Sequence, residues 1–175
     1  MIDPKVRALL DAAAALYELP RWGGVDLDGI PGIWEPGEWL AALVLTESSF
    51  DPRAKRYEPQ LDKLPDGDTP QADDGATEDD TSWGPMQVLG LNVKALLNAQ
   101  GAERLNYSVL QDWLIGVGFG MKILIGSFRR RDTSVDVALA RYNGGWAGNP
   151  RSDGTLRNQA YVDRVWKNCA IVRAT

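Results

Sequence analysis

The chain has 175 residues, a formal charge of −5 at pH 7, no histidine and one cysteine. Without histidine, Ser-His-Asp catalysis, Cys-His catalysis and histidine-ligated zinc are excluded, and a single cysteine excludes an internal disulfide. The length, together with 44% hydrophobic residues, suits one domain, 1–175, that buries its own core.

Charge and hydropathy exclude two further classes. An acidic chain is poorly suited to duplex nucleic acid, because phosphate binding needs clustered Lys and Arg, and the one basic run, Arg129–Arg131, is short. No window reaches the roughly 18 to 20 apolar residues of a membrane span, and no cleavage site follows the first residues. We therefore expect no nucleic acid, no membrane insertion and no signal peptide, with synthesis in the cytoplasm.

Six helices are predicted from apolar periodicity and end signals. The first, about 4–18, begins at Asp3-Pro4, and the second opens at Pro36 and runs to about 47. Residues 21–37 have the Gly, Pro and Trp content of a connecting segment, so 1–36 is an N-terminal helix and its connection. The other helices are predicted at about 91–100, 108–128, 134–142 and 157–172. Strand signals are weak, so the fold class is mostly α with little or no β-sheet.

The helix over 108–128 is predicted to be central and buried, because apolar side chains occupy two of its faces. Ser108 and Gln111 fit a capping box at its start. Each glycine inside a helix costs about 1 kcal/mol relative to alanine. Glycines therefore predict the close approach of a neighbouring backbone at Gly116, Gly118, Gly120 and Gly126.

Residues 57–81 form an acidic insertion without periodicity, which predicts a solvated loop. Asp66-x-Asp68 begins like a calcium-binding EF-hand loop. However, Gln71 stands where that loop needs glycine, and Thr77 stands where it needs glutamate. We expect no metal and no cofactor.

Glu47 is the acid that helix periodicity singles out. It shares a face with Leu40, Leu43 and Val44, so a carboxyl ends an apolar stripe. Burial would raise its pKa and let it donate a proton near neutral pH. The alternative is a frayed glutamate at the end of a helix that points to water.

Five segments follow one another along the chain: Glu47-Ser48-Ser49-Phe50, Ser82-Trp83-Gly84-Pro85-Met86-Gln87, Gly120 with Ile123-Leu124, Ala140-Arg141-Tyr142-Asn143-Gly144-Gly145 and Tyr161-Val162-Asp163-Arg164-Val165. Taken together and in this order, they resemble the soluble lytic transglycosylase domain, a lysozyme-like family related to goose-type lysozyme. The resemblance spans about 37–166, and the block Arg56-Tyr57-Glu58-Pro59 is most similar to members from phages and prophages.

The resemblance implies a lysozyme-like single domain with a deep substrate cleft, which cleaves the β-1,4 bond between N-acetylmuramic acid and N-acetylglucosamine in peptidoglycan. Glu47 would protonate the glycosidic oxygen and then take the proton of the muramyl C6 hydroxyl, closing a 1,6-anhydro ring. A second carboxylate is not required, unlike in most glycosidases. The implied substrate contacts are Ser49, Ser82, Trp83, Met86, Gln87, Tyr142 and Asn143, with Trp146 as a further stacking candidate.

Two departures from the family's sequence pattern leave open whether the bond is cleaved by transglycosylation or by hydrolysis. Pro85 replaces the usual leucine and removes a backbone donor, and Leu89 stands where goose-type hydrolases carry an aspartate that serves water. Secondary carboxylates that could replace that aspartate are Glu58, Glu78, Asp79 and Asp80. Muramidase hydrolysis of the same bond is therefore an alternative, and a non-catalytic glycan-binding or virion structural domain is another.

The partners implied are peptidoglycan glycan strands, with other phage virion or lysis proteins as further candidates, and we expect a monomer. Since no export signal is visible, action on the bacterial cell wall fits an endolysin released by a phage or a component of the virion.

Overall fold

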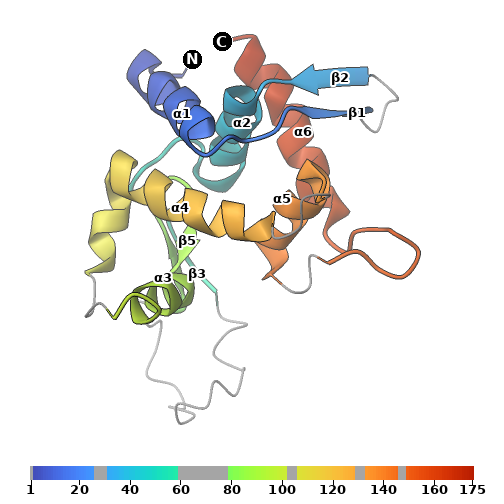
Figure 1. Cartoon of the computed structure of the whole chain (residues 1–175). Helices are drawn as coiled ribbons and strands as arrows, with labels where there is room; N and C mark the ends of the chain where they lie inside the picture. Colours follow the sequence, from blue (N-terminus) through green and yellow to red (C-terminus); the bar gives the residue numbers. More distant parts are fainter. Residues whose placement is uncertain (1, 26–30, 59–78, 102–105, 129–132, 146–148) are drawn as a thin grey trace.

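The computed structural model describes residues 2–25, 31–58, 79–101, 106–128, 133–145 and 149–175. These residues are mostly helical, which confirms the mostly α prediction in its coarse form (Figure 1). The helices are α1 (Pro4–Leu16), α2 (Pro36–Ser48), α3 (Gly90–Asn98), the 3-10 helix η2 (Tyr107–Gln111), α4 (Trp113–Ser127), α5 (Val135–Gly144) and α6 (Gln159–Arg173).

Helix α2 begins and ends on recognisable signals. The Glu35 backbone N–H donates to the Glu38 side chain at 2.8 Å, and Pro36 opens the first turn. Ser49, with a φ of 55°, ends the helix in the left-handed conformation. The middle of α2 is fully buried and packs against α1 and α6. Glu47 therefore lies in the last turn of the most buried helix.

An antiparallel hairpin replaces the predicted connection over 21–37, so that prediction is wrong. Strand β1 (Trp22–Val25) pairs with β2 (Pro31–Trp34). Glycine and proline hide the strand signal, whereas tryptophan packing stabilises the hairpin. The Trp166 ring of α6 packs in T-shaped contact with the rings of Trp22 and Trp34, with ring centroids 4.7 and 5.7 Å away. A Cβ at Gly32 would lie 3.1 Å from the Trp166 ring.

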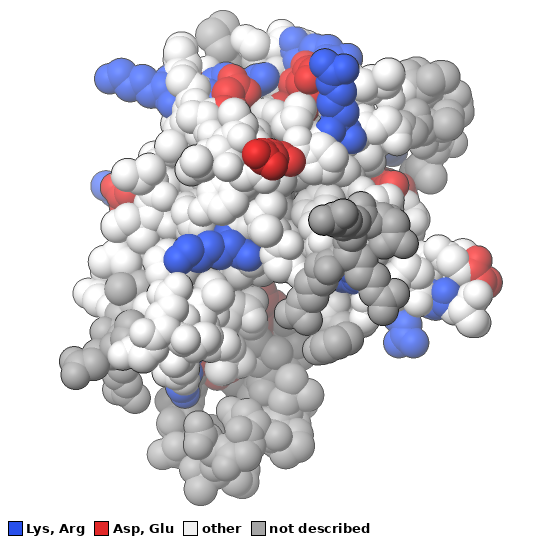
Figure 2. Space-filling model, viewed as in Figure 1, with Lys and Arg blue, Asp and Glu red and all other residues white. Residues whose placement is uncertain are grey.

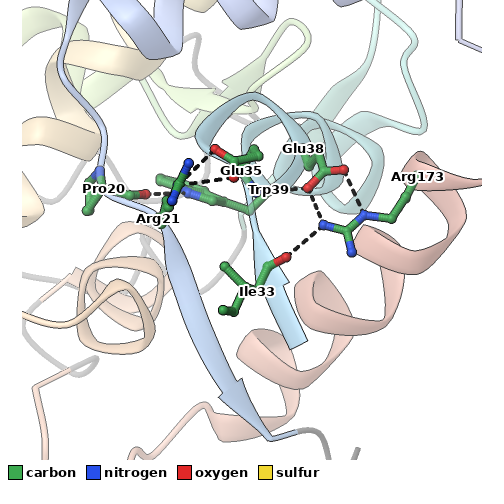
Figure 3. Close-up of polar contacts among 7 residues, drawn as sticks. All are labelled: Pro20, Arg21, Ile33, Glu35, Glu38, Trp39 and Arg173. Atoms are coloured by element: carbon green, nitrogen blue, oxygen red, sulfur yellow. Dashed lines mark hydrogen bonds and ion pairs between the residues drawn. The ribbon is translucent and has the colours of Figure 1, made fainter. Parts of the chain in front are cut away.

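A polar network ties this hairpin to the ends of α2 and α6 (Figure 3). Arg173 donates to both carboxylate oxygens of Glu38 at 2.8 and 2.5 Å, and to the Ile33 carbonyl at 2.7 Å. Its guanidinium also lies 4.1 Å from the centre of the Trp34 ring. Figure 2 shows charged side chains gathered at the end of the molecule where the two termini lie, which is the end that holds this network.

A second antiparallel sheet, in the order β3-β4-β5, lies on the other side of α4 from α1 (Figure 1). Its strands are β3 (Lys55–Tyr57), β4 (Thr81–Trp83) and β5 (Val88–Leu89). The two ends of the predicted 57–81 loop thus belong to strands, so that prediction is wrong at its ends. Residues 59–78, with the EF-hand-like stretch and Glu78, lie outside the described residues, as do Arg129–Arg131 and Trp146.

Helix α4 begins later than predicted. The Asp112 side chain accepts hydrogen bonds from the N–H groups of Leu114 and Ile115 at 2.9 and 3.1 Å, whereas the Ser108–Gln111 stretch forms η2. The capping box at Ser108 is therefore wrong: the true cap is the aspartate four residues on.

The close approach of a neighbouring backbone predicted for the α4 glycines holds at Gly116; at Gly120 the close neighbour is a side chain instead, and the prediction is wrong at Gly118 and Gly126. A Cβ at Gly116 would lie 2.3 Å from the Leu110 carbonyl oxygen, and one at Gly120 would lie 2.4 Å from Met86 Sδ. At Gly118 and Gly126 it would meet nothing within 4 Å. Among the described residues, no helix is long and apolar enough to cross a membrane.

Candidate active site

Glu47 lies against α6, partly buried, and accepts a hydrogen bond from the Tyr161 hydroxyl. Burial raises the pKa of this carboxyl, while the Tyr161 bond lowers it by a smaller amount. The pKa of Glu47 therefore stands above its ordinary value. Of the two sequence-based alternatives, the frayed glutamate pointing to water does not fit, because the carboxyl is partly buried and hydrogen-bonded within the protein.

A second tyrosine, Tyr142 on α5, is near enough for the charge of Glu47 to act on it. Its hydroxyl donates to the Met86 carbonyl at 2.6 Å, which connects α5 to the segment after β4. Burial, and then the charge of Glu47, raise the pKa of Tyr142 well above its ordinary value, and the same two causes raise that of Tyr161. Both phenols are therefore protonated hydrogen-bond donors at neutral pH.

Strand β3 brings a charge pair to the site. Arg56 Nε lies 2.6 Å from Glu58 Oε1, and the Ser82 hydroxyl donates to the same oxygen at 3.2 Å. The charge of Arg56 lowers the pKa of Glu47, that of Glu58 raises it, and Arg164 on α6 lowers it. Among the described secondary carboxylates expected from the sequence, the charge of Glu58 acts on Glu47.

The other described acids of that group lie at the base of the insertion. Asp79 accepts hydrogen bonds from Tyr107 at 2.6 Å and from Lys94 at 3.1 Å, which joins the strand end to α3 and η2. The Asp80 carbonyl accepts from the Glu58 N–H at 2.9 Å. The bond between Glu58 and Asp80 joins the two ends of the insertion, and the Asp79 bonds attach one of these ends to the helices beside it.

The Met86-Gln87 segment is more buried than its predicted contact with a sugar requires. Met86 is fully buried, and Gln87 is 8% exposed with a φ of 48°. The Gln87 amide nitrogen donates to the carbonyls of Ala54 and Gly84, both at 3.1 Å. The Gln87 amide thus stabilises the turn between β4 and β5. This turn positions the Met86 carbonyl that accepts the hydrogen bond from Tyr142.

Ser82 and Trp83 are likewise engaged within the protein. Ser82 is 3% exposed and bonded to Glu58, and Trp83 is 5% exposed. Lys55 Nζ lies 4.1 Å from the centre of the Trp83 ring, so this face of the indole is covered rather than open to a sugar. In this structure Ser82 and Trp83 therefore do not face a substrate; they stabilise the sheet that carries Arg56 and Glu58.

Ser49 and Asn143 are exposed, at the ends of α2 and α5. Asn143 Oδ1 accepts a hydrogen bond from Asn158 at 3.2 Å, and Asn158 also donates to the Ala140 carbonyl at 2.8 Å. These two positions keep their predicted roles as substrate contacts, which no contact in the structure tests.

Two residues at the site, Tyr161 and Arg56, lie in segments that carry the family resemblance, but neither has a role at the site in the sequence analysis. Tyr161 occupies the buried stripe of α6 with Val162 and Val165, where an aromatic is expected to be core. Arg56 sits in a segment without helical periodicity. The sequence signal that could have identified Tyr161 is its hydroxyl, since a phenol buried on a helix needs a hydrogen-bond partner.

Among the described residues, no group of three or more His, Cys, Asp or Glu could hold a metal ion. Comparisons with protein-family models, with curated proteins and with solved structures found no match. The site thus consists of a partly buried carboxyl with a raised pKa that accepts a hydrogen bond from one phenol, Tyr161, and whose charge acts on a second, Tyr142.

Proposed function

We propose that this chain is a peptidoglycan lytic transglycosylase, which cleaves the β-1,4 bond between N-acetylmuramic acid and N-acetylglucosamine and leaves a 1,6-anhydro-muramyl end. The observation that carries the proposal is Glu47: a partly buried carboxyl with a raised pKa, hydrogen-bonded to Tyr161 at the end of an apolar helix. Such a group is suited to act as a general acid near neutral pH.

The reaction uses this carboxyl twice. Glu47 gives its proton to the glycosidic oxygen as the bond from that oxygen to the muramyl C1 breaks. The carboxylate then takes the proton of the C6 hydroxyl, and O6 forms the new bond to C1. Water is not consumed, and Glu47 ends protonated as it began. Between the two steps Tyr161 donates to the carboxylate and stabilises its charge.

Muramidase hydrolysis of the same bond is the second candidate, and Glu58 is the observation that favours it. Its charge acts on Glu47, so a second carboxylate is at hand to serve water. The paired carboxylates of most glycosidases divide their work in this way.

Product analysis separates the two. Purified sacculi are digested, and the soluble fragments are examined by mass spectrometry and by reducing-end assay. We expect anhydro-muramyl ends, which do not reduce. Reducing ends alone would select the muramidase, and intact sacculi after incubation with folded protein would reject both activities.

The variant that tests the site is Glu47→Gln, which removes the proton donor and keeps an oxygen for Tyr161. We expect cleavage to be lost. Because the raised pKa means that the folded state holds the proton more tightly than the unfolded state, the wild type loses stability as pH rises through that pKa. Glutamine does not ionise, so the variant should be more stable than wild type at neutral pH.

The matched control is Glu18→Gln, the same chemical change at an exposed glutamate after α1. It should cleave sacculi like wild type. An inactive control, or a Glu47→Gln variant that remains active, would contradict the assignment of Glu47.

A further inference from the structure

Asn158 precedes the first turn of α6, but its side chain does not cap that helix. An asparagine in this position usually accepts a hydrogen bond from an N–H of the first turn through Oδ1. In Asn158 this oxygen is buried and accepts from none of the described residues, although buried polar atoms are nearly always paired. The direction of this amide is therefore set by its nitrogen.

The Asn158 nitrogen meets two oxygens at the end of α5. Nδ2 donates to the Ala140 carbonyl at 2.8 Å and to Asn143 Oδ1 at 3.2 Å. A main-chain carbonyl can only accept, so Asn158 must turn its NH₂ group toward Ala140. An NH₂ group can only donate, so Asn143 must present its oxygen to Asn158 and carry its own NH₂ group on the other branch of the amide.

Asn143 is exposed at the end of α5. Because its oxygen is engaged by Asn158, its NH₂ group is the part of the amide left for a ligand. An NH₂ group selects a ligand oxygen that accepts a hydrogen bond and does not pair with a group that can only donate. The carbonyl of an N-acetyl group is an acceptor of this kind, and both sugars of the proposed substrate carry one.

The same asparagine connects this amide to the candidate active site. The Asn158 carbonyl accepts a hydrogen bond from the Tyr161 N–H at 2.9 Å, in the first turn of α6. The Tyr161 hydroxyl donates to the Glu47 carboxyl. One continuous series of contacts thus runs from the exposed Asn143 amide to the partly buried acid.

We propose that Asn158 is a positioning residue that sets the specificity of this site. By fixing the Asn143 amide with its NH₂ group outward, it makes the end of α5 a hydrogen-bond donor for the N-acetyl carbonyl of a glycan strand. The direction of the amide follows from the bond to the Ala140 carbonyl. The choice of an N-acetylated glycan as the ligand rests on the proposed function.

The direction of the two amides is tested by NMR on the whole ¹⁵N-labelled chain. The side-chain NH₂ signals are identified by their loss in Asn143→Ala and in Asn158→Ala. The NH₂ protons of Asn158, which are hydrogen-bonded, should exchange slowly with water, whereas those of Asn143 should exchange fast. The reverse order, or equally fast exchange at both residues, would overturn the proposal.

Binding is measured with two uncharged β-1,4 tetramers, one of N-acetylglucosamine and one of glucose, which lacks the N-acetyl carbonyl. The wild type should bind the N-acetylated tetramer more tightly, and this tetramer should shift the Asn143 NH₂ signals. Asn158→Ala should weaken its binding by about 2- to 10-fold, the contribution of one neutral hydrogen bond, and leave the glucose tetramer unaffected. Equal affinity of the wild type for the two tetramers, or no binding of either, would overturn the proposal.

The double variant shows whether Asn158 acts through Asn143. If it does, Asn158→Ala should not weaken binding further in a chain that already carries Asn143→Ala. A merely structural role at the start of α6 would weaken binding in both backgrounds, and that result would reject the positioning role. The control is Asn92→Ala, the same change at an exposed asparagine of α3, which should bind both tetramers like wild type.

Cleavage of sacculi is scored separately, since neither the NMR measurement nor the tetramer titration depends on turnover. Preferential binding of the N-acetylated tetramer, with no further loss in the double variant, in a protein that leaves sacculi intact would support the role of Asn158 and reject the transglycosylase. Cleavage by a protein whose tetramer binding is unchanged in Asn158→Ala would support the enzyme and reject the role of Asn158.

Discussion

The four glycines of α4 provide a matched experiment within one helix. Alanine at each position gains up to about 1 kcal/mol of helix propensity. At Gly118 and Gly126 the added methyl meets nothing within 4 Å, so we expect these two variants to be at least as stable as wild type.

At the other two positions there is no room for an added methyl group. At Gly120 the new Cβ would lie 2.4 Å from Met86 Sδ and 2.6 Å from Met86 Cβ. The thioether can swing aside, but the Cβ moves only with its backbone, and overpacking of this kind costs about 1–3 kcal/mol. At Gly116 the obstacle is the Leu110 carbonyl oxygen at 2.3 Å, which belongs to the backbone of η2. We expect Gly116→Ala to be the most destabilised of the four.

Urea denaturation followed by circular dichroism measures the differences, and thermal unfolding should agree at about 2–4 °C per kcal/mol for a chain of this size. Gly120→Ala should also impair cleavage, because Met86 carries the carbonyl that accepts from Tyr142. Equal stability of Gly118→Ala and Gly120→Ala would refute the packing of the Met86 segment against α4.

Three further outcomes are expected. Arg173→Lys loses the two-pronged bond to Glu38 and should lower the free energy of unfolding by about 1–2 kcal/mol in urea; an unchanged midpoint would contradict it. Tyr161→Phe removes the bond that lowers the pKa of Glu47, so the high-pH limit of cleavage should move upward; a downward move would show that the phenol acts otherwise. Burial raises the pKa of Asp136, so wild type loses stability as pH rises through that pKa, and Asp136→Asn should be more stable at neutral pH but not in acid.

Local signals predicted the helices well where end chemistry and apolar periodicity agree. Asp3 caps α1 as expected, with a bond from the Lys5 N–H at 2.7 Å. Glu35 to Pro36 opens α2 where predicted. Because a helix repeats every 3.6 residues, a correct start also fixes which side chains face inward, and this is how Glu47 could be found before the structure.

The sheets could not be found in this way, because their stability comes from contacts across the chain. The hairpin of β1 and β2 is rich in glycine, and it depends on Trp166 from α6, more than a hundred residues away. Arg56 reaches the site through pairing with Ser82 across the long insertion. Tyr161 reads as core on its own helix, and only its packing against α2 shows which polar group its hydroxyl meets.

Helices α2 and α6 run antiparallel, and each is fastened to the other at both ends. Arg173 holds Glu38 at one end, Tyr161 holds Glu47 at the other, and Asn168 donates to Thr46 Oγ1 at 2.9 Å between them. From Arg173 back to Tyr161 is about 18 Å of helix at 1.5 Å per residue. Sliding α6 by one turn would break every one of these bonds together. The two helices are therefore bonded to each other along their length, and the place of the Glu47 carboxyl depends on the register that these bonds fix.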